Sequence, residues 1–327
     1  MTRVTVTLAG SGLAELTCAR LLAERGHRIR LPAREPAGPR PLLLNAPTLE
    51  LFRSLWPEDP AALLPGAVRL TGRLVGWGAG TAPRRLAQPA LLVDGTALAA
   101  RLAALLADRC SGAGPHDWLV TAAPGGQPAA GRRRLLAGEA LLARGVDERT
   151  ARLECTTLGW LQLTPLGDGR ALLQAMVPGP VERPAALLAR LLAGSRLAPL
   201  LRRAPNSAAA VEAAPRLHPA PATAPAAAAA GPAPGRLVVG AGAIRYDPLS
   251  GTGTAQALRT AILAAAVIDS AARGTPPGPL CTHYTARLAA AFREHLDRCA
   301  ALYGEAFPWP AWQDEIDAAR VAGSGTG

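Results

Sequence analysis

Apolar positions near the N-terminus predict a strand, a helix and a second strand, in that order. Val4–Leu8 is a short apolar run typical of a buried strand, and Leu13–Arg25 carries apolar side chains at helical spacing. A second strand is expected over Arg28–Leu31. The intervening Gly10-Ser-Gly12 is typical of the tight turn in a βαβ dinucleotide-binding unit. We therefore expect half of a Rossmann-like domain here.

The middle of the chain favours β-structure. Glu154–Leu163 and Arg170–Val177 predict a strand pair, and the Gly-Asp-Gly at 167–169 between them is a strong turn signal. The Ala- and Pro-rich stretch 219–234 predicts a flexible or polyproline-like connector. Around these segments we expect helices over 48–56, 96–108 and 183–201, strands over 117–121 and 207–217, and a loop over 39–47.

The last third of the chain returns to the strand and helix order of the first. Arg236–Val239 predicts a buried strand, Thr252–Ala272 a long apolar helix, and Thr282–Tyr303 an amphipathic helix before a Trp-containing tail. This order predicts an α/β fold with a discontinuous Rossmann-like domain. Its two parts are expected at 1–127 and 231–275, with a β-rich substrate domain inserted at 128–230 and a C-terminal helix and tail at 276–327.

The net charge does not indicate a nucleic-acid partner. The charge is +11, but all 35 basic residues are Arg, and they are spread through a chain rich in Ala, Pro and Gly. The basic triplet Arg132–Arg134 is a run of the kind usually found on a solvated surface. At 4% of the chain, aromatic residues are too few to form stacking platforms for bases.

The sequence also carries no signal for a membrane or an oxidising compartment. No uncharged apolar run reaches the roughly 18–20 residues of a membrane span. The chain enters a strand-like run at Val4, which leaves no room for a secretory leader. The five Cys are scattered without a CxxC spacing, so reduced thiols are expected. We predict a cytoplasmic protein with no membrane partner.

The absence of lysine excludes several kinds of chemistry. A Walker-type phosphate lysine, a Schiff-base lysine and a lysine general base are all ruled out. The five His show no metal-ligand spacing, and the sequence contains no GxSxG nucleophile motif. We therefore expect neither a metal site nor a serine hydrolase.

The most informative motif is Asp247-Pro-Leu-Ser-Gly-Thr-Gly253, between the late strand and the long helix. With Gly10 and Gly12 it resembles the flavin-binding motifs of FAD-dependent monooxygenases and halogenases with the para-hydroxybenzoate hydroxylase fold. The stretch from Gly159 to Pro165 is similar to a motif of tryptophan halogenases. The Tyr- and Trp-containing end of the chain resembles flavoprotein maturases, which hydroxylate tryptophan in precursors of quinone-cofactor amine dehydrogenases and oxidases.

The resemblance implies that FAD contacts both glycine loops. Glycines of the first loop bring backbone amides to the pyrophosphate, and the helix beginning at Leu13 directs its positive end at that phosphate. The second loop is expected to contact the flavin. The residues implied in FAD binding are Gly10, Gly12, Leu13, Asp247, Pro248, Gly251, Thr252 and Gly253. The candidate catalytic residues are Asp247 and Trp160.

The resemblance also implies a reaction. Reduced flavin would capture O₂ and, through a flavin hydroperoxide, hydroxylate an aromatic small molecule or a tryptophan in a polypeptide, with electrons from a separate donor. The similar halogenases relay hypohalous acid through a lysine, which this chain lacks. We therefore predict an FAD-dependent monooxygenase rather than a halogenase.

Four positions depart from the flavin motifs. They are Glu15 at the third glycine, Ala33 where an acid holds the ribose (Glu35 is two residues on), Ala241 at the ribityl Asp, and Gly95 where an Arg follows Asp94. A Glu15 carboxylate would repel a pyrophosphate if it pointed inward. Each lost charged hydrogen bond costs about 1.5–3 kcal/mol, so FAD could be bound weakly or not at all.

These departures leave two alternatives open. One is a non-catalytic homologue that has lost FAD and serves as a binding or maturation partner. The other is an NAD(P)-binding reductase that uses only the first glycine motif.

Overall fold

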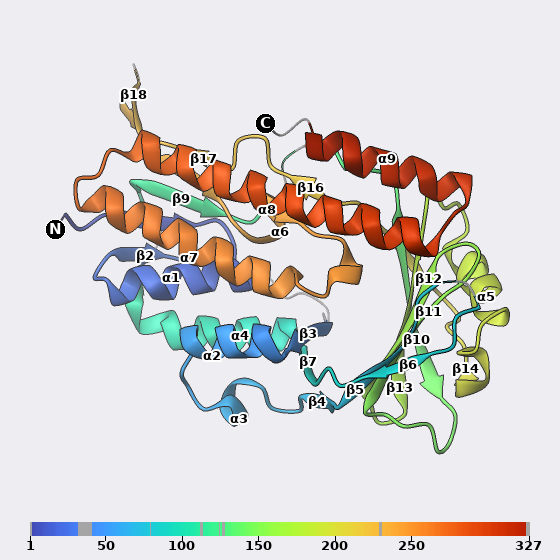
Figure 1. Cartoon of the computed structure of the whole chain (residues 1–327). Helices are drawn as coiled ribbons and strands as arrows, with labels where there is room; N and C mark the ends of the chain where they lie inside the picture. Colours follow the sequence, from blue (N-terminus) through green and yellow to red (C-terminus); the bar gives the residue numbers. More distant parts are fainter. Residues whose placement is uncertain are drawn as a thin grey trace.

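The computed structural model describes residues 2–31, 41–78, 80–111, 114–123, 125, 128–228 and 231–324. Figure 1 shows a body of stacked helices and strands that contains both the N-terminal segment and the late helix α7. A second, strongly twisted sheet stands beside this body, with helix α5 on its outer face. Helix α8 runs across the top of this body toward the second sheet, and α9 lies above the far end of α8 in this view.

Sheet 1 is the Rossmann-like part. Its strand order is β17-β20-β9-β1-β2-β8, and every neighbouring pair is parallel except β17 with β20. The late strand β20 therefore lies beside β9, as expected from the return of the strand pattern at Arg236–Val239. The bounds are β1 Thr5–Leu8, β2 Arg28–Arg30, β8 Cys110–Ser111, β9 Trp118–Thr121, β17 Ala222–Thr223 and β20 Gly235–Val238.

Helices cover sheet 1 where the apolar periodicity predicts them. The helix α1 packs on α7, and both contribute to the largest apolar core. By length and composition α7 could cross a membrane, but 61% of its most apolar window is buried, so it is a core helix. The bounds are α1 Leu13–Glu24, α2 Ala46–Leu55, α3 Pro60–Leu63, α4 Gly95–Leu106, α6 Gly240–Ala243 and α7 Gly253–Ala272, with 3₁₀ turns η1 Ala107–Arg109 and η3 Pro248–Ser250.

Sheet 2 is mostly antiparallel and has the order β14-β10-β13-β12-β11-β5-β6, with β15 also paired to β10. Neighbouring residues of β12 point to opposite faces, as strand geometry requires. Leu161 packs toward α5, whereas Trp160 packs toward the C-terminal helices. The bounds are β5 Gly72–Gly76, β6 Arg84–Leu86, β10 Arg134–Leu142, β11 Thr150–Cys155, β12 Trp160–Gly167, β13 Arg170–Val177, α5 Pro184–Ala193, η2 Ala198–Leu200, β14 Leu201–Arg203 and β15 Ala209–Glu212.

The α/β fold class is confirmed, but several predicted elements are wrong. The expected strand Glu154–Leu163 is two strands, because the Thr156 amide donates to the Gly159 carbonyl and turns the chain. The expected helix 183–201 ends at Ala193, directly before Gly194. The expected strand 207–217 is divided between β15 and β16, which belong to different sheets. Strand β10 was not predicted.

Two segments expected to be irregular contain strands. The predicted loop 39–47 holds β3, Pro41–Asn45, which pairs with β7, Ala90–Asp94, and β7 also pairs with β4, Val68–Leu70. The Ala- and Pro-rich stretch contains β17 and the hairpin of β18, Ala226–Ala228, and β19, Gly231–Ala233. Strand β16, Arg216–Leu217, pairs with β21, Ile244–Arg245. Backbone pairing, which local composition does not reveal, orders these segments.

The C-terminal region is more helical than predicted. Helix α8 covers Pro277–Ala306 and the tail forms a further helix, α9, over Pro310–Ser324. In α8, the Tyr284 hydroxyl donates to the Val238 carbonyl on sheet 1 at 2.7 Å. One end of α8 therefore anchors on sheet 1, while the other packs against sheet 2.

The domain boundaries at 127/128, 230/231 and 275/276 stay a prediction.

Substitution of Gly159 should test the tight contact beside Trp160. A Cβ at this position would lie 1.9 Å from the Met176 carbonyl oxygen on the paired strand. We expect Gly159→Ala to lower the free energy of unfolding by about 1–3 kcal/mol, measured by urea denaturation. Gly194→Ala, where nothing lies within 4 Å, is the matched control and should change stability little. Equal stability of the two variants would contradict the close contact.

Candidate functional site

The loop from Asp247 to Thr252 connects strand β21 to helix α7 and is built by short-range hydrogen bonds. The Asp247 carboxylate accepts from the Leu249 amide at 2.9 Å, which caps the 3₁₀ turn η3. Gly251 has φ +60°, a conformation that favours glycine. Helix α7 then begins at Gly253, so its first backbone amides border this loop.

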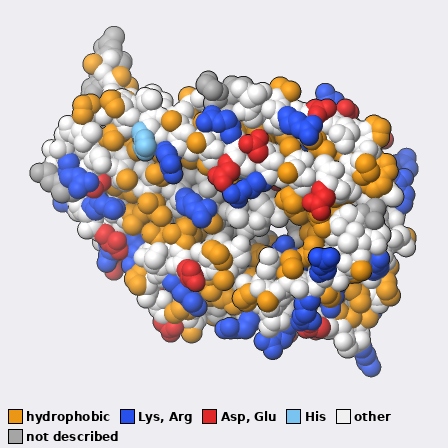
Figure 2. Space-filling view, viewed as in Figure 1, with side chains coloured by type: hydrophobic (Ala, Val, Ile, Leu, Met, Phe, Trp, Pro, Cys, Tyr) orange, Lys and Arg blue, Asp and Glu red, His pale blue; other side chains and the backbone are white. Residues whose placement is uncertain are grey.

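Open space lies beside the two glycines of this loop. A Cβ added at Gly251 or at Gly253 would meet nothing within 4 Å. Figure 2 shows the molecular surface hollowed between the N-terminal end of α7 and sheet 2. A helix N-terminus carries partial positive charge, so this part of the surface suits an electron-rich group. The loop geometry therefore leaves room for a ligand on the side the resemblance assigns to the flavin.

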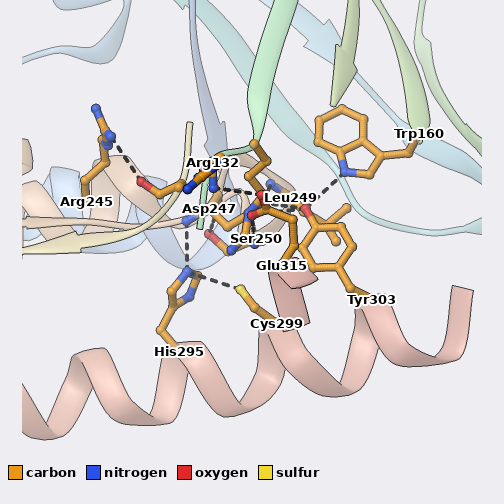
Figure 3. A network of polar contacts seen from close by, with 12 residues as sticks. Arg132, Trp160, Arg245, Asp247, Leu249, Ser250, His295, Cys299, Tyr303 and Glu315 are labelled. Atoms are coloured by element: carbon orange, nitrogen blue, oxygen red, sulfur yellow. Dashed lines mark hydrogen bonds and ion pairs between the residues drawn. The ribbon is translucent and has the colours of Figure 1, made fainter. Parts of the chain in front are cut away.

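A buried network of polar side chains contacts the Asp247 loop from the side of sheet 2 and from the C-terminal helices (Figure 3). Arg133 is fully buried, and its Nε donates to Asp247 Oδ2 at 2.8 Å. Its Nη1 donates to Glu315 Oε2 at 3.1 Å. The Tyr303 hydroxyl lies 3.0 Å from both Asp247 carboxylate oxygens, and the Trp160 indole N–H donates to that hydroxyl at 3.2 Å. One carboxylate therefore joins the loop before α7 to Arg133, directly before sheet 2, and to Tyr303 of α8.

His295 holds the backbone of the same loop. Its Nε2 accepts from the Asp247 amide at 2.8 Å, and the Cys299 sulfur lies 3.3 Å from the same nitrogen. The Tyr246 ring stacks on the imidazole, with 4.0 Å between centroids. Burial, reinforced by the positive charges of Arg133 and Arg298, lowers the pKa of His295 to about 4. The imidazole is therefore neutral at pH 7 and serves as a hydrogen-bond acceptor.

Burial also fixes the protonation of the other groups around Asp247. Desolvation, with the nearby Asp247 charge, raises the pKa of the Tyr303 hydroxyl well above its usual value. Burial raises the pKa of the Cys299 thiol to about 12. The Tyr303 ring stacks on Trp312 with 4.6 Å between centroids. The network is a rigid support for the loop, with Tyr303 and Cys299 protonated at pH 7.

The first glycine loop is occupied by a side chain of the protein itself. Glu15 is 4% exposed, and its carboxylate accepts from the Gly12 amide and the Ala122 amide, both at 3.0 Å. A Cβ at Gly10 would lie 2.6 Å from Glu15 Oε1. Burial raises the pKa of this carboxyl, while the Gly12 and Ala122 hydrogen bonds partly oppose the increase. The carboxylate does point inward.

Two of the other departures from the flavin motifs, Ala241 and Gly95, lie in the first turns of helices. Ala241 is exposed in α6. Gly95 begins α4, and the preceding Asp94 accepts from the Thr96 amide at 2.8 Å as the helix cap. The Ala33 and Glu35 positions lie outside the described residues.

Sequence reasoning missed most of the buried network. The triplet Arg132–Arg134 was expected on a solvated surface, which is wrong for Arg133 because two acidic side chains pair with it in the interior. Nothing in the local sequence marks its partner Glu315. Among the residues that the structure describes, no group of three His, Cys, Asp or Glu is arranged to hold a metal ion.

The two loops can be compared with the space that FAD, the cofactor implied by the motifs, would need. The loop at Gly251 and Gly253 has room, and the backbone at Gly12 is obstructed only by the flexible end of Glu15. The residues present therefore fit FAD provided that the Glu15 carboxylate moves aside.

The structure of this chain is similar to several solved structures. The structure superposes on peptidyl tryptophan dihydroxylase QhpG, essential for tryptophylquinone cofactor biogenesis, with a TM-score of 0.76 at 21% identity over 96% of this chain and 79% of that one. This chain shares its fold with this dihydroxylase and with flavin-dependent halogenases.

Two further solved structures share the fold. The flavin-dependent halogenase CmlS gives a TM-score of 0.75 at 17% identity, covering 96% of this chain and 68% of that one. HpxO of Klebsiella pneumoniae, solved with FAD, gives 0.65 at 15% identity, covering 98% and 97%. No family sequence model and no curated protein sequence matches the chain.

Loss of the Arg133 charge should strongly destabilise the protein. Arg133→Met leaves the carboxylates of Asp247 and Glu315 buried without their cation, which costs about 3–5 kcal/mol in comparable pairs. Chemical denaturation measures the change. The control is Arg170→Met, because Arg170 pairs with Glu139 on the same sheet while both side chains are 52% exposed. The control should cost no more than about 1 kcal/mol, and a similar loss in both variants would contradict the buried pair.

His295 should make stability fall at acidic pH. Its pKa is about 4 in the folded protein, against 6.5 for an ordinary imidazole, so the unfolded chain takes up the proton first as pH falls. The His295 contribution is therefore complete above pH 6.5 and is lost as pH falls toward 4, by up to about 1.4 kcal/mol per pH unit. Urea titrations across this range should show a shallower pH slope for His295→Gln than for the unmodified protein. Equal slopes would contradict the assignment.

Proposed function

We propose that the protein is an FAD-dependent monooxygenase that hydroxylates an aromatic substrate, with a tryptophan of a polypeptide as the preferred class. The observation that carries the proposal is the open loop at Gly251 and Gly253, at the N-terminus of α7, within a fold shared with flavin-dependent enzymes. FAD, when bound, would supply the activation of O₂. A separate electron donor and a cytoplasmic location belong to the same proposal.

The roles proposed for the chain's residues follow from their contacts. Gly10, Gly12 and Leu13 would face the pyrophosphate, while Pro248, Gly251, Thr252 and Gly253 would face the flavin. Asp247 and Trp160 are buried and bonded to Arg133 and Tyr303, so we assign them as positioning residues of the loop. The polar network would keep the loop fixed against sheet 2.

The choice of a polypeptide substrate rests on two observations. The hollow between α7 and sheet 2 opens on the molecular surface in Figure 2, where a side chain of another protein could enter. The similar QhpG structure is a peptidyl tryptophan dihydroxylase. An aromatic small molecule is the alternative substrate class, and the same hollow would receive it.

A second candidate function is a non-catalytic binding or maturation partner that has lost FAD. The specific observation in its favour is the Glu15 carboxylate, which holds the amides of the first glycine loop. The two candidates differ in one measurable property, because only the first requires flavin.

Flavin retention tests the proposal directly. The purified protein is incubated with excess FAD, desalted and examined by visible absorbance, then supplied with reductant, O₂ and a tryptophan-containing peptide. We expect retained flavin and a peptide mass gain of one or more oxygen atoms. A folded protein that retains no flavin would favour the binding partner.

A glycine variant locates the bound flavin. Gly253→Val fills the open space at the start of α7 without a predicted clash, so we expect loss of flavin retention with stability unchanged. Gly278→Val is the control, because Gly278 also lies in the first turn of a helix with nothing within 4 Å. Retention of flavin by the Gly253→Val protein would contradict the proposed contact.

A further inference from the structure

The first glycine loop lies where two parallel strands of sheet 1 end side by side. Strands β1 and β9 are paired in register, so the segments that follow them, at Gly10–Gly12 and at Ala122, meet at one edge of the sheet. In open α/β sheets, ligands bind outside this carboxyl edge. Free backbone amides there are suited to an anion, and the helix α1 adds its positive end.

Glu15 bridges these two segments. Its Oε2 accepts from the Gly12 amide and its Oε1 from the Ala122 amide, both at 3.0 Å. Part of this arrangement is an ordinary helix cap, since a Glu at the third helical position commonly accepts from the N-cap amide. The contact with Ala122 is not part of a helix cap, because Ala122 follows a different strand 107 residues away.

The carboxylate also fills the space that the glycines leave open. Its oxygens would lie 2.6 Å and 2.9 Å from a Cβ at Gly10, and one lies 3.0 Å from a Cβ at Gly12. The room that glycines give a ligand phosphate is therefore taken by an anion of the protein. A second anion at the same amides would face a buried like charge, where repulsion is only weakly screened.

We propose that Glu15 is a built-in substitute for the dinucleotide pyrophosphate, so FAD can enter the first loop only after this carboxylate has left the amides of Gly12 and Ala122. Glu15 thereby sets the affinity of the chain for FAD. The inference rests on the proposed function, because it concerns the same cofactor. The movement is feasible, since the obstructing atoms are the end of a flexible side chain.

A comparison of FAD, which contains a pyrophosphate, with riboflavin, which does not, distinguishes a specific effect of Glu15 on the pyrophosphate from a general effect on the fold. We would titrate FAD and riboflavin into the full chain and into Glu15→Ala, following flavin fluorescence. FAD should bind Glu15→Ala at least about tenfold more tightly than the unmodified protein, whereas riboflavin affinity should change less than about twofold. Glu15→Gln keeps the size of the side chain and loses its charge, so its affinity for FAD should lie between those of Glu15→Ala and the unmodified protein.

Glu24→Ala is the control for this experiment. Glu24 lies on the same helix, its side chain is 43% exposed, and it contacts neither glycine loop. We expect this variant to bind both flavins as the unmodified protein does.

Each other result has a distinct meaning. If the unmodified protein binds FAD as tightly as Glu15→Ala does, the inference is overturned and the proposed function stands. An equal gain for riboflavin and FAD would also overturn the inference, because the effect would not involve the pyrophosphate. If all folded variants bind neither flavin, the proposed function fails and the inference fails with it.

Discussion

The buried charge of Arg133 is the constraint on which the relative placement of the parts depends. A guanidinium without solvent access must be paired, because an isolated buried charge is very costly. Arg133, directly before the second sheet, pairs with Asp247 of the loop before α7 and with Glu315 of the last helix. Asp247 in turn accepts from Tyr303 of α8. The Asp247 carboxylate in the loop before α7 is therefore held by Arg133 beside sheet 2 and by Tyr303 of α8, and Arg133 is held in turn by Glu315 of α9.

The two glycine loops of this fold differ in how accessible their backbone is to a ligand. The loop before α7 keeps its turn conformation and borders open space, whereas the N-terminal loop is closed by one carboxylate. The backbone architecture of both is intact, so the difference lies in a single side chain, Glu15. Under the proposed function, FAD binding depends on how easily the Glu15 side chain turns away from these amides.

The sequence predicts elements whose pattern is local. The strand, glycine turn and helix at the N-terminus are found as expected, because their periodicity is complete within a short window. Strand β3 was missed because it depends on pairing with β7, and α9 because Pro and Trp dominate its start. The buried state of Arg133 could not be predicted, since its partners Asp247 and Glu315 lie 114 and 182 residues away.

The length of α8 restricts how the molecule can move. The helix has 30 residues and therefore spans about 45 Å without a break. Tyr284 near its start is bonded to the first sheet, and Tyr303 near its end is packed against the second. A continuous helix that contacts both sheets acts as a spacer, so it opposes hinge closure around the hollow. The width of the hollow is thus preset, and side chains and loops must control entry.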